Sequence, residues 1–195
     1  MKSAAPTADL RRVDTLFQLG GCLDGLRGVR HWEVLFPALG IRSTLEAVRV
    51  TVRPARHADA PEIQVVGGDN GAQFRNDARA VVQAVRSCER RLAPTWDTLV
   101  TLPSVSLVGR SYDLALALAD RIARGREFPG TGRIIATGAV ETRLEGRIGC
   151  VRSVADGRDG GGPGHSVDPA GKLALLRDAA LPGDSLIVPA DWQVV

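Results

Sequence analysis

The chain has 195 residues, 44% of them hydrophobic and 24% charged, a balance typical of a globular protein and not of a disordered or fibrous one. The formal net charge of +3 is too small to predict a nucleic-acid-binding protein, and no apolar run approaches the roughly 18 residues of a transmembrane helix. No apolar stretch near the N-terminus has the form of a secretory signal. Cys22, Cys88 and Cys150 form no CxxC pair, so we expect reduced thiols and a cytoplasmic location.

An N-terminal extension is expected over residues 1–40, ahead of a main domain over residues 41–195. Residues 1–8 carry no hydrophobic pattern. The apolar clusters of residues 9–40 fit both a short helix and an apolar hairpin or arm, so these interpretations stay open.

The main domain alternates between strand and helix patterns. Period-two alternation over residues 45–53 predicts a half-buried strand, and the apolar face of residues 71–92 predicts an amphipathic helix. Residues 112–124 are apolar nearly all round, which is typical of a helix in the centre of the molecule. Further elements are strands at 62–66, 98–102 and 185–189, a hairpin from 132–138 to 145–151, a glycine-rich insertion at 156–168 and a helix at 170–180. Strands mixed with about three main helices predict an α+β fold.

Several motifs of known chemistry are absent from the sequence. Lys172 follows Gly171, but Leu173 takes the place of the hydroxyl residue that holds magnesium in a P-loop. The histidines lack the spacing of metal ligands, and we expect neither a metal nor another cofactor. The run from Gly109 ends in Asp113, where the nucleophile elbow Gly-x-Ser-x-Gly needs glycine.

Lys172 stands out from the composition, because Lys2 and Lys172 are the only lysines among 25 basic residues. Lys172 begins a predicted helix, where the helix dipole disfavours a positive charge, and its apolar neighbours would lower the pKa of its amine. A neutral amine can act as the general base for a serine hydroxyl. Ser111 begins another predicted helix, as either an N-cap or a nucleophile whose oxyanion the helix N–H groups stabilise. From these residues alone, unrelated roles as a cap and a surface lysine stay open.

From about Glu62 to Asp191 the chain resembles the Lon-type Ser–Lys protease domain. A strand that ends in proline precedes the serine, a helix of small residues follows it, and a Thr-Gly strand end and a Gly-Lys helix come later in the family's order. The segments that carry this resemblance are 97–103, 109–111, 136–138, 171–180 and 186–189.

The resemblance implies a fold like the second domain of ribosomal protein S5. It also implies an endopeptidase that hydrolyses a protein or peptide substrate through an acyl-enzyme, with Ser111 as nucleophile and Lys172 as general base. Thr137 would hold the lysine amine by a hydrogen bond. The residues implied at the oxyanion hole and along the strand that receives the substrate are Gly109, Arg110, Tyr112, Leu102 and Pro103.

The sequence departs from the family around the serine. Arg110 replaces the usual proline, and Tyr112 and Asp113 replace a small Ala-Gly pair, which would narrow the cleft or bring a charge to it. Without an ATP-driven unfolding module in this chain, we expect a peptidase that either receives substrates from a separate ATPase or regulatory partner or cleaves exposed segments. A homo-oligomer is compatible with both arrangements.

A second class of function stays open beside the protease. The same fold resembles the accessory domains of the RadA and ComM families, which lack the dyad and serve assembly or DNA handling. The presence of both Ser111 and Lys172 in register, in a chain nearly devoid of lysine, favours the protease.

Overall fold

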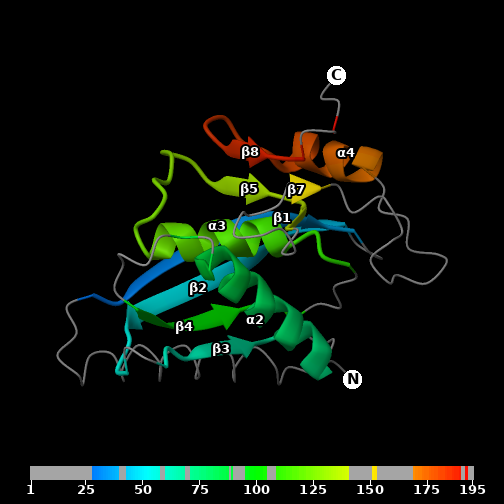
Figure 1. Cartoon of the computed structure of the whole chain (residues 1–195). Helices are drawn as coiled ribbons and strands as arrows, with labels where there is room; N and C mark the ends of the chain where they lie inside the picture. The colour runs from blue at the N-terminus through cyan, green and yellow to red at the C-terminus, as the bar shows by residue number, and fades with distance from the viewer. Residues whose placement is uncertain are drawn as a thin grey trace, which may run out of the picture.

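A computed structural model of the chain describes residues 28–39, 43–57, 60–68, 71–87, 89, 95–104, 109–140, 151–152, 169–189 and 192. Its centre is a six-stranded mixed sheet in the order β3-β4-β2-β1-β5-β8, and β6 and β7 form a separate two-stranded sheet (Figure 1). The strands are β1 (Arg30–Ala38), β2 (Thr44–Pro54), β3 (Ile63–Val66), β4 (Trp96–Thr101), β5 (Ile134–Ala136), β6 (Ala139–Val140), β7 (Val151–Arg152) and β8 (Ser185–Ile187). The helices within these residues are α2 (Gly71–Ser87), α3 (Asp113–Ala123) and α4 (Pro169–Ala179). The expected α+β class, with a mixed sheet and three helices, is confirmed.

β1 is a central strand of the sheet. It pairs antiparallel with β2 along its whole length and parallel with β5 on its other side. The interpretations left open for residues 9–40 can be compared with the structure only over residues 28–39, where β1 is a strand paired with β2. The extension expected over residues 1–40 therefore contributes its last part to the sheet of the main domain, while residues 1–27 lie outside the described chain.

Helices cover both faces of the six-stranded sheet. Val34 and Phe36 of β1 pack into the large core with α2 and α3, whereas Leu35, between them, packs into a second cluster with Leu176 of α4. Because successive side chains of a strand point to opposite faces, α4 lies on the face opposite α2 and α3. Among the described residues, no helix is both long and apolar enough to cross a membrane.

The hairpin expected from residues 132–138 to 145–151 was assigned to the wrong first strand. β5 pairs in parallel with β1 and β8, and the antiparallel partner of β7 is the short strand β6. A strand at the centre of the sheet can pair with segments far away in the chain, which local patterns do not reveal. The glycine-rich insertion at 156–168 and the three cysteines lie outside the described residues.

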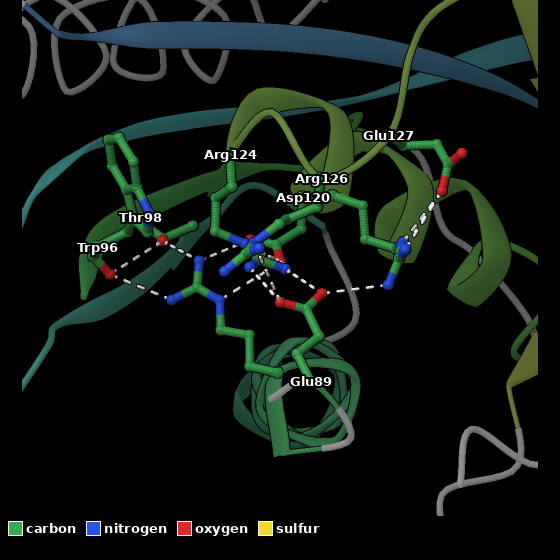
Figure 2. A network of polar contacts seen from close by, with 9 residues as sticks. Glu89, Trp96, Thr98, Asp120, Arg124, Arg126 and Glu127 are labelled. Carbon is green, nitrogen blue, oxygen red and sulfur yellow. Dashed lines mark hydrogen bonds and ion pairs between the residues drawn. The ribbon is translucent and has the colours of Figure 1, made fainter. Parts of the chain in front are cut away.

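A charged network fixes the C-terminal end of α3 to the end of α2. Asp120 is fully buried and accepts hydrogen bonds from Arg86 at 2.6 Å and from Arg124 at 2.8 Å. Arg124 also donates to both carboxylate oxygens of Glu89, at 2.6 and 2.9 Å. Figure 2 shows Glu89, Asp120 and Arg124 pointing toward one another. Paired guanidinium groups compensate for the burial of the Asp120 charge and so anchor the helix that begins beside Ser111.

Candidate active site

Ser111 lies in a tight turn immediately before α3. Gly109 begins this turn with a φ of +78°, a conformation that favours glycine, and the N–H of Asp113 donates to the carbonyl of Arg110 at 3.0 Å. The N-cap position is Tyr112, which makes no side-chain capping bond. Within the described chain the hydroxyl of Ser111 has no hydrogen-bond partner. The capping role that would explain this serine structurally is therefore not observed.

Tyr112 anchors the turn in the core. Its ring is buried and lies 4.8 Å from the ring of Phe74 and 6.3 Å from that of Phe36, centroid to centroid. Burial raises the pKa of its hydroxyl. The expectation that Tyr112 narrows a cleft is wrong, because the aromatic side chain fills space between the helices and the sheet.

The segment that follows β5 holds the Ser111 turn from the side. Gly138 donates its N–H to the carbonyl of Ser111 at 3.0 Å and accepts the N–H of Leu114 at 3.1 Å. The hydroxyl of Thr137 lies 3.4 Å from the same Ser111 carbonyl and donates to it. The Thr-Gly strand end thus meets the serine, although the hydroxyl of Thr137 contacts Ser111 and not the lysine amine that the resemblance implied.

The backbone amides around Ser111 divide into occupied and available groups. The N–H groups of Asp113 and Leu114 donate to the carbonyls of Arg110 and Gly138. Among the described residues, the N–H groups of Ser111 and Tyr112 have no acceptor. Available amides at the start of a helix are the type of donor that stabilises an oxyanion, so these two are the candidates for the oxyanion hole.

The expected substrate strand is not available for pairing. β4 lies between β3 and β2, so both of its edges are occupied. Beyond its end, Leu102 donates its N–H to Val66 at 2.9 Å, and the carbonyl of Pro103 accepts the N–H of Gly68 at 3.3 Å. The prediction that an extended peptide adds to the strand ending at Leu102 and Pro103 is therefore wrong, because β-augmentation needs a free edge.

Lys172 lies in the first turn of α4 and is 4% exposed. Burial lowers the pKa of its amine from 10.5 to about 8. No acidic residue stands in the first turn of α4, and no carboxylate pairs with Lys172 within the described chain. A buried amine without a counter-ion is expensive to keep charged, so a substantial fraction of it is neutral near pH 8.

α4 packs against β1 and the beginning of β2, on the face of the sheet opposite α3. Its last carbonyl, at Ala179, accepts a hydrogen bond from Arg133, just before β5 begins. One turn earlier, Leu176 packs with Ile135 in the middle of β5. Lys172 is one further turn toward the N-terminal end of α4. The serine turn and Lys172 thus belong to helices on opposite faces of the sheet.

The structure thus brings some of the predicted site residues into contact but not all of them. Ser111 and Thr137 are in direct contact, and Gly109 and Tyr112 shape the turn. Among the described residues, the amine of Lys172 makes no hydrogen bond to Ser111 or Thr137. The part of the chain that the structure describes contains no group of three His, Cys, Asp or Glu side chains that could hold a metal ion.

Sequence reasoning did not assign a role to Arg110 and Asp113 as a pair. The guanidinium of Arg110 lies 2.7 Å from the carboxylate of Asp113 and donates to the carbonyl of Val140 at 2.8 Å. One signal in the sequence could have indicated this ion pair. Arg110 and Asp113 are three residues apart, a spacing that brings side chains together on a helical turn, and both stand where the Lon-type domain has proline or small residues.

Comparison with known proteins gives no family for this chain. No family model and no curated protein matches it. A crystal structure from Thermus thermophilus is similar over 50% of this chain and 15% of that chain, with 17% sequence identity and a TM-score of 0.29. The match spans a small part of that protein's length and carries no argument for a fold or a function.

Proposed function

We propose that this chain is a Lon-like serine endopeptidase in which Ser111 is the nucleophile and Lys172 the general base. The observation that carries the proposal is the buried Lys172, which has no counter-ion within the described chain and whose pKa is lowered to about 8. Lys172 is the one lysine of the described residues.

In the proposed reaction, the neutral amine of Lys172 takes the proton of the Ser111 hydroxyl as the oxygen attacks the peptide carbonyl. The available N–H groups of Ser111 and Tyr112 stabilise the oxyanion that forms. The lysine ammonium then protonates the departing amine, which leaves an acyl group on Ser111. A water molecule, deprotonated by Lys172, hydrolyses this ester and restores the free hydroxyl.

The proposal requires the Lys172 amine and the Ser111 hydroxyl to meet when substrate is bound. Catalytic hydrogen bonds are often long in the free enzyme and tighten in the complex. The backbone of Ser111 is already fixed by Gly138, so the flexible lysine side chain makes the closing movement. The substrate class is an extended protein segment, either exposed by itself or delivered by a separate ATPase or regulatory partner.

The alternative function is a catalytically inactive domain that serves assembly or binding, of the type found in RadA and ComM proteins. The observation in its favour is that no hydrogen bond joins Lys172 to Ser111 among the described residues. This alternative leaves the burial of an unpaired lysine at that position without a purpose.

The test is covalent labelling with a fluorophosphonate reagent, together with hydrolysis of a fluorogenic peptide library near pH 8. We expect one adduct, located on Ser111 by mass spectrometry, and its loss in the variants Ser111→Ala and Lys172→Met. Ser87→Ala, which removes a surface hydroxyl bonded to Ala84, is the matched control and should react like the parent. A folded parent protein that neither labels nor cleaves supports the inactive alternative, and cleavage by Ser111→Ala removes the proposed dyad.

A further inference from the structure

Asp113 is a second buried ionisable group at the Ser111 turn, and the proposed mechanism does not use it. Its side chain is 1% exposed and lies in the first turn of α3. The Oδ2 atom lies 2.7 Å from the guanidinium of Arg110 and accepts the N–H of Val140 at 3.3 Å. The other carboxylate oxygen, Oδ1, is buried and has no hydrogen-bond partner within the described chain.

Arg110, Asp113 and Val140 form a closed set of contacts around Ser111, which we call the Asp113 clamp. Arg110 precedes Ser111 and donates to the carbonyl of Val140 at 2.8 Å, while Asp113 follows Ser111 and accepts the N–H of that same residue. Both sides of the serine turn are thereby attached to one residue of β6. With the Gly138 contacts, the clamp leaves the turn little freedom of its own.

The contact between Arg110 and Asp113 also explains why an arginine is tolerated at this turn. A carboxylate buried to this extent is unfavourable unless a charge and hydrogen bonds compensate for it. Arg110 is the cation that meets it, and the side chain of Arg110 remains 34% exposed. The clamp is therefore an ion pair with one buried partner and one partner that solvent reaches.

We propose that Asp113 is a positioning residue for the Ser111 nucleophile, because its ionised carboxylate holds Arg110 and Val140 and so fixes the serine turn against β6. Loss of the charge releases Arg110 and loosens the turn. The catalytic part of this inference rests on the proposed function, whereas the clamp itself does not.

The clamp titrates in the neutral range. The pKa of the Asp113 carboxyl is raised to about 7, mainly by burial and also by Asp77 of α2, although Arg110 and the N–H of Val140 act in the opposite direction. These groups, with the un-ionised Tyr112, are the charged and polar neighbours that the structure gives it. Protonation of Asp113 below neutral pH therefore weakens the clamp, separately from the protonation of Lys172.

Catalysis then requires two groups to be deprotonated. Lys172 must lose its proton to act as base, and Asp113 must lose its proton to hold the turn. The logarithm of kcat should rise with a slope of two below both pKa values and a slope of one between them. In Asp113→Asn the slope should be one at every pH below the pKa of Lys172, and kcat should fall roughly 10- to 100-fold, because small displacements of a nucleophile cost that much.

A nuclear magnetic resonance titration tests the clamp without catalysis. The amide signal of Val140 is followed from about pH 5 to 9 in the parent, in Ser111→Ala and in Asp113→Asn. We expect a transition near pH 7 in the first two proteins and none in the third. An amide of Val140 that does not titrate in the parent overturns the proposal.

Arg110→Gln provides a second variant that keeps the buried carboxyl in place. Because Arg110 lowers the pKa of Asp113, its removal should move the Val140 transition and the acid limb of kcat to higher pH. A clamp with only a structural role would still move the Val140 transition but would leave the acid limb of kcat where it is. The matched control is Arg49→Gln, which removes an arginine from the exposed pair with Glu33 and should shift neither.

The outcomes separate this inference from the proposed function. A titrating clamp in a parent protein whose Ser111 never reacts with a fluorophosphonate supports the clamp and removes the peptidase. A reactive Ser111 whose kcat profile is the same in Asp113→Asn supports the peptidase and overturns the positioning role. The whole inference is supported if Asp113→Asn has a lower kcat, an acid limb of kcat with a slope of one in place of two, and a KM that is little changed.

Discussion

Gly138 donates its N–H to the carbonyl oxygen of Ser111 at 3.0 Å, and this bond joins the serine turn to the end of β5. The preceding residue, Thr137, donates its own N–H to Ile187 of β8, also at 3.0 Å. β8 follows α4 in the chain, and α4 carries Lys172. A short path of backbone hydrogen bonds thus connects the turn that holds the serine with β8, the strand that follows α4 in the chain.

The first prediction concerns the pH dependence of peptide hydrolysis. Because the pKa of Lys172 is lowered to about 8, the rate should rise as the pH increases toward that value and level off above it. Lys172→Arg should lose activity by a factor on the order of 10³ or more, since guanidinium stays protonated and cannot act as a base. Initial rates with a fluorogenic peptide, measured from about pH 6 to 10, check both statements. A rate in Lys172→Arg equal to that of the parent would exclude lysine as the base.

The second prediction concerns stability and the same lysine. The pKa of Lys172 in the folded chain lies below its ordinary value of 10.5, so the unfolded chain binds more protons between about pH 8 and 10.5. The free energy of unfolding should therefore rise with pH through this window, by up to roughly 3 kcal/mol. Lys172→Met should remove that rise and be more stable than the parent at neutral pH. Denaturant titrations at several pH values measure the difference, and parallel curves for the two proteins would contradict the prediction.

The third prediction concerns the charged network at the end of α3. Asp120→Asn leaves Arg86 and Arg124 without their buried anion and should destabilise the fold by roughly 3 kcal/mol or more. Glu33→Gln removes a carboxylate from an exposed pair with Arg49 and should change stability by less than about 1 kcal/mol. Urea denaturation compares the two variants. Equal effects would mean that the buried position of Asp120 does not matter.

Sequence patterns predicted the elements that depend on local periodicity. The central helix α3 was identified because it is apolar nearly all round, and in the structure nine of its residues, Asp113 and Asp120 among them, are buried. The resemblance to the Lon-type domain implied a site shared by Ser111, Thr137 and Lys172, and in the structure Thr137 contacts the carbonyl of Ser111.

The features that sequence patterns missed depend on contacts between distant segments. β1 pairs on one side with its hairpin partner and on the other with β5, which follows about a hundred residues later in the chain. The closed edges of β4 exclude the expected substrate strand for the same reason. Asp113 looked like a charge brought to a cleft, but its contact with Val140 of β6 gives it a buried position that no local spacing indicates.

The fourth prediction compares two glycines with nearly the same backbone conformation. Gly67 has a φ of +80° and Gly71 a φ of +81°, but a Cβ atom at Gly67 would overlap the carbonyl of Leu102, whereas no atom of the described residues lies within 4 Å of one at Gly71. Gly71→Ala should therefore cost about 1 kcal/mol from strain alone. Gly67→Ala should cost more, on the order of 3 kcal/mol, because the loop after β4 must move. Thermal unfolding distinguishes them, and equal costs would show that the close approach at Leu102 is unimportant.

The fifth prediction follows from the raised pKa of Asp113. In the folded chain this pKa is about 7, above the ordinary 3.8, so between these values the folded protein keeps a proton that the unfolded chain has lost. The free energy of unfolding should fall as the pH rises through that window, by a few kcal/mol, and the fall should be absent in Asp113→Asn. Denaturant titrations from about pH 4 to 8 measure this slope.

The matched control for this last prediction is Asp184→Asn, which also removes a carboxylate paired with an arginine, Arg133. The pKa of Asp184 is lowered to about 2, so its stabilisation is lost only in acid and adds no slope between about pH 4 and 7. If Asp113→Asn and Asp184→Asn gave the same pH profile, the carboxyl of Asp113 would not titrate in the neutral range. If only Asp113→Asn flattens the dependence of the free energy of unfolding on pH, ionisation of the Asp113 carboxyl opposes folding. Because the serine turn needs this charge at the same pH, the clamp then lowers stability in order to position Ser111.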